Sequence, residues 1–135
     1  MYSPNFLPVA EDGSDGYIAL ISKILGAAGV PVTSYTIGGV NDAYLVAQAI
    51  KAAGKKLTRK RLIAAMAKAA SFKTAAFVAF RGDTHQGYSG YYIGRYDTNL
   101  VQQRVSAGTY ETDSGSGAVT LSTFSRPAAP ANLLP

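Results

Sequence analysis

The chain contains no cysteine and only one histidine among its 135 residues. The absence of cysteine excludes disulfides and zinc sites built on thiolates. With a single histidine, carboxylates are nearly the only metal ligands left, and Glu11, Asp12 and Asp15 sit where acids favour a helix dipole. We therefore expect no metal site and no cofactor.

Catalytic motifs and long apolar runs are also missing. His85 lies in an expected turn, and no Gly-x-Ser-x-Gly elbow accompanies it, although a general base needs a nucleophile within reach. No apolar run approaches the roughly 18 residues that span a bilayer. The first residues lack the basic and apolar regions of a signal peptide. We expect no catalytic residues and no enzymatic activity, and an export signal, if any, outside this chain.

Charged residues are few, at 16%, and the net charge of +5 is concentrated in one place. Six basic residues lie within eleven positions that contain no acid: Lys51, Lys55, Lys56, Arg59, Lys60 and Arg61. Without these six, the charge is 5 − 6 = −1. Such a cluster is typical of solvated helix ends, with a nucleic-acid patch as the less favoured alternative.

Helical spacing of apolar residues dominates the first half of the chain. Ser14 or Asp15 caps a first predicted helix, and Gly26 and Gly29 end it. A second helix, capped by Asn41 or Asp42, is predicted to run to about Ala53, and a third from the cap Thr58 to about Ala70. Their apolar side chains are expected to face inward: Ala43, Leu45, Val46, Ala49 and Ile50, then Leu62, Ile63 and Met66.

Strand patterns dominate the second half. A hairpin is predicted from strands 91–96 and 100–105 around a turn at 97–99. A buried strand is predicted at 75–80, a short strand or extended link at 32–37, an entry strand or crossover at 1–10, and one more strand at 119–124. A Gly/Ser-rich linker is expected at 112–117 and a Pro/Ala tail from 126.

Tyr35 lies on the segment 32–37, just before the pair Gly38-Gly39 and a predicted helix start. In an α/β fold such a position is near the carboxyl ends of strands, where ligands bind. Backbone N–H groups at a helix start can also bind an anion. We therefore predict Tyr35, Gly38 and Gly39 as ligand-binding residues, with a packing role as the alternative for the two glycines.

Four segments, in order, resemble the periplasmic solute-binding proteins of the leucine/isoleucine/valine-binding type. The stretch 39–54, Gly-Val-Asn-Asp-Ala through to Ala-Ala-Gly, is similar to a family helix that reads Gly-Tyr-Asp-Ala-Ala and closes with Ala-Gly. Val40 stands where that helix usually has tyrosine. Segments 56–66, 80–88 and 92–101 resemble the elements that follow it. The resemblance covers roughly residues 1–110 and the C-terminal third of the family's chain.

The resemblance implies an α/β fold, part of a two-lobed type I periplasmic-binding-protein fold with helices on a parallel sheet. Residues 1–80 would belong to the first lobe, 81–111 would form the closing hairpin toward the second lobe, and 112–135 would be the tail. The chain would cross between the lobes, and a side chain such as Tyr35 would line the cleft.

The function implied is that of the substrate-binding component of an ABC importer, or a part of it, with a membrane permease as partner. It would bind a small solute such as an amino acid without catalysis, in the periplasm or at the cell surface.

Two alternatives stay open. One is a structural or interaction module that self-associates through the Tyr-rich hairpin or pairs with a missing upstream lobe. The expectation of such a lobe has a physical basis, since three helices need more strands to cover than this sequence offers. The other alternative is a nucleic-acid-binding module at 51–61, although we expect no nucleic acid as partner.

Overall fold

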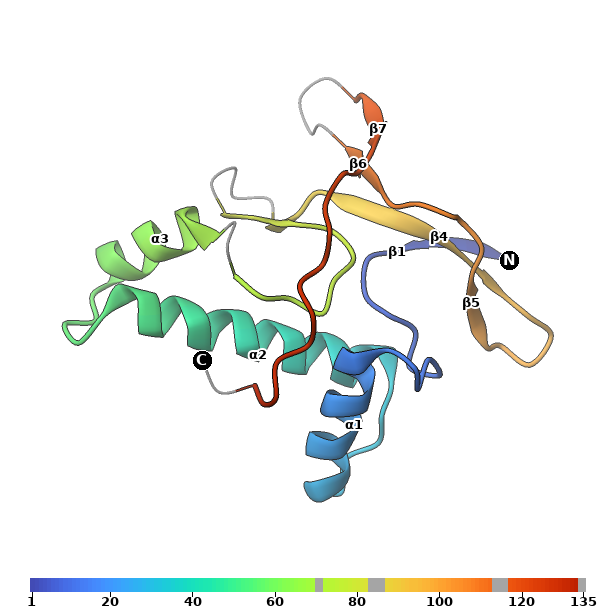
Figure 1. Cartoon of the computed structure of the whole chain (residues 1–135), viewed down its shortest axis with the longest axis horizontal. Coiled ribbons are helices and arrows are strands. Elements are labelled where there is room, and N and C mark those ends of the chain that lie inside the picture. Colours follow the sequence, from blue (N-terminus) through green and yellow to red (C-terminus); the bar gives the residue numbers. More distant parts are fainter. Residues whose placement is uncertain (70–71, 83–86, 113–116, 134–135) are drawn as a thin grey trace.

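A computed structural model describes residues 1–69, 72–82, 87–112 and 117–133, and it separates helices from strands (Figure 1). The helices α1 (Gly16–Ala27), α2 (Ser34–Ala53) and α3 (Arg59–Ala67) occupy the left and lower parts of the view. The main sheet occupies the upper right, and it contains five strands: β1 (Tyr2–Asn5), β4 (Gly90–Tyr96), β5 (Gln102–Arg104), β6 (Tyr110–Thr112) and β7 (Val119–Leu121).

Each helix begins at a side-chain cap. The Asp15 carboxylate accepts hydrogen bonds from the backbone N–H groups of Tyr17 (2.9 Å) and Ile18 (3.2 Å), and the Thr58 hydroxyl accepts one from Arg61 (3.3 Å). Such caps satisfy N–H groups that have no partner within the helix. The predicted caps at Asp15 and Thr58 are confirmed, although α3 ends at Ala67 and not near residue 70.

The start of α2 differs from the prediction. Thr33 and Thr36 form a reciprocal capping box, in which each side chain accepts a hydrogen bond from the other's backbone N–H. The strand expected at 32–37 is therefore wrong, and so is the helix start at Asn41 or Asp42. The β preference of threonine and isoleucine is weak and yields to the cap and to the complete burial of Ile37.

Gly38 and Gly39 consequently lie inside α2, in its second turn. A helix-interior glycine costs about 1 kcal/mol relative to alanine, which packing elsewhere in the helix must offset. A Cβ at Gly38 would lie 3.6 Å from Leu7, whereas one at Gly39 would meet nothing within 4 Å.

The sheet is built around β4. β1 pairs along one side of it, from Tyr2 opposite Arg95 to Asn5 opposite Tyr92. β5 and then β6 pair along the other side, and β7 extends the sheet beyond β6. The predicted hairpin is confirmed as β4 and β5, and β7 confirms a strand within 119–124. Every strand pair among the described residues is antiparallel, so the expected parallel sheet is not found in this part of the chain.

The segment 75–80 is buried as predicted, but it is not a strand for most of its length. Ala75, Ala76 and Val78 are at most 1% exposed. Only the two-residue strand β2 (Phe80–Arg81) pairs, with β3 (Gly87–Tyr88). An apolar run indicates burial, but a strand also needs a neighbouring strand at the right distance.

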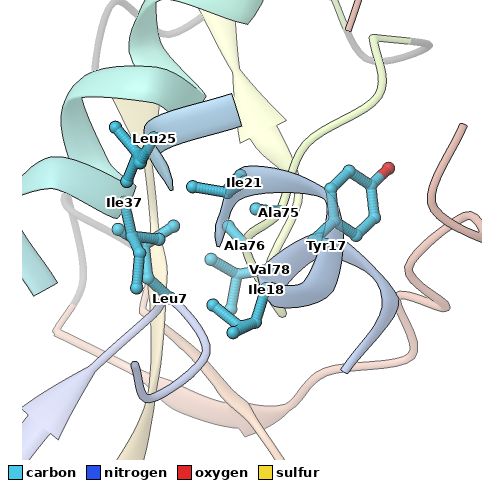
Figure 2. Close-up of a cluster of buried hydrophobic side chains, with 9 residues drawn as sticks. All are labelled: Leu7, Tyr17, Ile18, Ile21, Leu25, Ile37, Ala75, Ala76 and Val78. Carbon is cyan, nitrogen blue, oxygen red and sulfur yellow. The ribbon is translucent and has the colours of Figure 1, made fainter. Parts of the chain in front are cut away.

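The core lies between α1, α2 and the segments that connect the helices to the sheet. Figure 2 shows its nine buried side chains: Leu7, Tyr17, Ile18, Ile21, Leu25, Ile37, Ala75, Ala76 and Val78. Val46 and Ile50 of α2 and Ile63 of α3 are 44–49% exposed, and Ala43 is exposed too, so the expected inward position of these four side chains is wrong. The buried face of α2 follows instead from Ile37 through Asn41 and Leu45 to Ala49.

The chain passes between the helices and the sheet three times, at 6–15, 72–79 and 122–130 (Figure 1). The crossings are joined: the Phe77 N–H donates to the Phe6 carbonyl (2.8 Å), and Arg126 donates to the Ala75 carbonyl (2.7 Å). Because β1 pairs with β4, the first residues of the chain belong to the sheet. The division into a helical part and a sheet part therefore does not follow the order of the sequence. The division at residues 80 and 111 stays a prediction.

Candidate functional site: the hinge pocket

A polar hollow lies where the three crossings meet the start of α1. We call it the hinge pocket; its volume is about 370 Å³, and it is lined by Val9, Asp12, Ser14, Asp15, Gly16, Phe77, Tyr92, Arg104 and Arg126. The lining comes from all three crossings, from α1 and from strands β4 and β5. A movement of the helices against the sheet would therefore change its shape.

Two guanidinium groups flank the ring of Phe77. Arg126 lies 4.3 Å and Arg104 lies 4.7 Å from the ring centroid, distances at which a cation is attracted to an aromatic face. Arg104 also lies 5.2 Å from the ring centroid of Tyr92. The aromatic rings thus hold two positive charges in one pocket.

Arg126 is neutralised by Asp15. Its Nη2 forms an ion pair with the Asp15 carboxylate, whose other oxygen caps α1. The two side chains are 18% and 5% exposed, respectively. The pair joins the third crossing to the start of α1, so we assign Arg126 mainly to holding the pocket together.

Arg104 and Asp12 are the other two charged residues that line the hinge pocket. Arg104 donates from Nε to the Ser106 carbonyl (3.3 Å), and no carboxylate among the described residues pairs with it. Asp12 accepts hydrogen bonds from the N–H (3.2 Å) and hydroxyl (2.6 Å) of Ser14, and no described cation forms an ion pair with it. One cation and one anion are therefore left at the pocket without a described partner of opposite charge.

The ring of Tyr92 forms an apolar wall of the pocket, and its hydroxyl is directed to the first crossing. It is fully buried, its hydroxyl donates to the Leu7 carbonyl (2.7 Å), and its ring meets Phe77 edge to face at 5.6 Å. Burial raises the pKa of Tyr92 to about 12, against the opposing effect of the nearby Arg104 charge. The hydroxyl stays protonated at neutral pH and serves as a structural donor.

The chemistry of the pocket is suited to binding. A guanidinium recognises a carboxylate, a carboxylate recognises an ammonium group, and aromatic rings hold apolar groups. Among the described residues, no group of histidine, aspartate and glutamate side chains could hold a metal ion. His85 and the turn around it lie outside the described residues.

The predicted ligand-binding residues lie elsewhere. Tyr35 is 93% exposed in the first turn of α2, and Gly39 is exposed one turn later. Gly38 is half-buried beside the first crossing, where a Cβ added to it would lie 3.6 Å from Leu7. None of the three lines the hinge pocket, and the observed cap of α2, Thr33, lies eight residues before the earlier of the two predicted caps, Asn41.

A buried polar cluster near the second crossing was not predicted. The Asn41 side chain accepts from the Ala75 N–H (2.8 Å) and from the Thr74 hydroxyl (3.1 Å), and it donates to the Tyr88 hydroxyl (2.7 Å). Asn41 and Thr74 are at most 1% exposed. Burial raises the pKa of Tyr88, and its hydrogen bonds to Thr74 and Asn41 lower it. The effect of burial is the larger, so the pKa is raised.

This cluster fixes the second crossing against α2. Asn41 was interpreted as a helix cap from its residue type. Its spacing of four residues from both Ile37 and Leu45 was the signal for a buried face. The residues of the hinge pocket were also missed, because they come from five separate places in the chain.

The family model described as periplasmic binding protein matches residues 1–102. No curated protein and no solved structure matches the chain. The mixture of helices and a partial antiparallel sheet is consistent with the α/β fold predicted for part of such a protein. The chain belongs to the periplasmic binding protein family, of the leucine/isoleucine/valine-binding type.

Proposed function

We propose that this chain supplies the hinge side of a solute-binding site, and that the solute is a small zwitterion such as an amino acid. The family supports a solute-binding role and an extracellular or periplasmic location. The observation that carries the finer proposal is the hinge pocket, which holds one cation and one anion without described ion-pair partners beside two aromatic rings.

The proposed binding mode uses both charges. The solute carboxylate lies against the Arg104 guanidinium, and its ammonium group faces Asp12. Its side chain packs on the half-buried Phe77. Charge-assisted hydrogen bonds to both ends of the solute would select a zwitterion over a simple acid or amine. A volume of about 370 Å³ lies at the lower end of small-molecule pockets and suits a small solute.

The proposed role is transport binding without chemical change. No part of the pocket that the structure describes contains an imidazole or a thiol to act as a base or nucleophile. Within the proposal, the chain acts with an ABC importer, delivers its solute to a membrane permease, and closes about the three crossings. Among the described residues, no helix is sufficiently long and apolar to cross a membrane.

The test is isothermal titration calorimetry of the chain with the twenty standard amino acids, followed by Arg104→Gln and Asp12→Asn. We expect saturable binding that each substitution weakens by tenfold or more, because each removes one charge-assisted contact of about 1.5–3 kcal/mol. Arg95→Gln is the matched control, since Arg95 is exposed on the neighbouring strand β4 and does not line the pocket.

Binding that is unchanged in Arg104→Gln and Asp12→Asn would refute the proposed site while leaving the family's binding role intact. Tyr35, Gly38 and Gly39 stay proposed ligand-binding residues for that case. Tyr35→Ala then serves as their direct test, because the exposed side chain can be removed without opening the core.

An interaction module is the second candidate function. The outward strand β7 is exposed along its whole length, with Val119 and Leu121 at 54% and 65%. Val46 and Ile50 leave an apolar strip on α2. Both features fit self-association or pairing with an upstream lobe. Sedimentation equilibrium over a range of concentrations tests the first, with a concentration-independent monomer as the contradicting result.

A further inference from the structure

The basic cluster forms one continuous corner of the molecule. Lys51 lies in the last turn of α2, and Arg59, Lys60 and Arg61 lie in the first turn of α3. All six basic residues of the segment 51–61 are exposed. Arg61 donates to the Lys56 carbonyl (3.4 Å), which ties α3 to the turn before it. Figure 1 shows this corner, where α2 joins α3, at the opposite side of the molecule from β5.

The placement of these charges opposes the stability of α3. The amino end of a helix carries a partial positive charge, so three cations in the first turn are unfavourable. No acidic residue stands in that turn, and no ion pair joins the six to a carboxylate among the described residues. Because these three cations destabilise the start of α3, their presence indicates that positive charge at this corner serves a purpose other than folding.

Two aliphatic side chains are exposed among the charges. Leu57, in the turn between the helices, is 52% exposed, and Ile63, one turn into α3, is 48% exposed. The segment 45–71 contains no aromatic residue. Lysine and arginine around exposed leucine and isoleucine are typical of surfaces that rest on the headgroups of an anionic membrane.

We propose that this basic corner docks the protein on an anionic phospholipid surface, with Leu57 and Ile63 reaching toward the acyl boundary. Single-stranded nucleic acid is the less fitting partner, since it is bound by basic grooves that also present aromatic rings to the bases. This proposal is independent of the solute, because no residue of the corner lines the hinge pocket.

The experiment is co-sedimentation with vesicles, using phosphatidylcholine alone and an equimolar mixture of phosphatidylcholine and phosphatidylglycerol. We expect binding to the anionic vesicles only, weakening steeply as salt is raised. Lys55→Gln, Lys56→Gln and Lys60→Gln are combined in one variant. Each basic residue near an anionic surface is worth about fivefold in partitioning, so the triple variant loses about a hundredfold.

The matched control removes the same charge elsewhere, with Lys23→Gln, Lys73→Gln and Arg95→Gln combined, all at exposed positions outside 51–61. It retains most of the binding if the corner is the docking site. Equal loss in both triple variants would show a net-charge effect and overturn the proposal, and so would tighter binding to a DNA oligonucleotide or to polyglutamate than to the anionic vesicles.

A second measurement reports how deeply the corner enters the membrane interface. The chain contains no tryptophan, so Leu57→Trp introduces a single tryptophan at the corner, whose emission lies at longer wavelength than that of the nine tyrosines. Its emission shifts to shorter wavelength on anionic vesicles if the side chain enters the interface. An unshifted spectrum on vesicles that sediment the protein would overturn the proposed orientation. Circular dichroism of every variant verifies that the helices are retained.

Discussion

Replacing Arg126 with alanine should destabilise the fold by about 3 kcal/mol. The substitution leaves the Asp15 carboxylate, 5% exposed, without its ion-pair partner, and the Ala75 carbonyl without its side-chain donor. Removing one partner of a buried pair costs about 3–5 kcal/mol. The lower end applies because Asp15 keeps its two hydrogen bonds from the start of α1. Lost contacts with the rings of Tyr17 and Phe77 act in the same direction.

The assay is urea unfolding followed by circular dichroism, with the free energy of unfolding from linear extrapolation. Arg95→Ala is the control, and it should change that free energy by less than about 0.5 kcal/mol, as exposed positions usually do. Asp15→Asn and the double variant complete a cycle whose coupling energy we expect at about 1–3 kcal/mol. A change below about 0.5 kcal/mol in Arg126→Ala would refute the view that this residue fastens the third crossing to α1.

Three further predictions concern single positions. Tyr17→Phe should leave stability unchanged or raise it by about 1 kcal/mol in urea unfolding, because the Tyr17 hydroxyl is buried and has no partner among the described residues; a loss above that size would mean the hydroxyl is satisfied. Gly39→Ala should stabilise the protein by about 0.5–1 kcal/mol, since the new methyl meets nothing within 4 Å in the middle of α2, and calorimetry on the same variant shows whether its predicted ligand role holds. The raised pKa of Tyr92 predicts alkaline instability: its contribution is fully present below pH 10.0, is lost as pH rises to about 12, and amounts to roughly 3 kcal/mol. Urea unfolding across that range should show the loss, and Tyr92→Phe should flatten it.

Local features could be predicted where a few neighbouring residues decide the outcome. The caps Asp15 and Thr58 were identified because an aspartate or threonine before an apolar helical pattern satisfies free N–H groups. The β4–β5 hairpin was identified because alternating residues surround the turn at 97–99. The family was identified because the order of several segments, each weak alone, survives in the sequence.

The start of α2 shows where local patterns failed. Residues 32–37 have a β-type composition, but Thr33 and Thr36 cap each other and Ile37 is buried against the first helix and the crossings. The helix therefore continues through Gly38 and Gly39. A glycine pair predicts a break only when no packing offsets its penalty, and here Ile37 packs in the core cluster that contains Leu7, thirty residues away.

By itself the sequence determined the family, most helix and strand positions, the concentration of positive charge at 51–61, and the absence of cysteine chemistry. The tertiary structure decided the hinge pocket, since Asp12, Phe77, Arg104 and Arg126 are brought together only by the three crossings. It also decided which of two neighbouring polar residues is buried, as with Asn41 beside the exposed Asp42. The physical reason is the same in both cases: helix caps act between near neighbours, whereas burial, charge pairing and the hydrogen bonds between crossings depend on which distant segments meet.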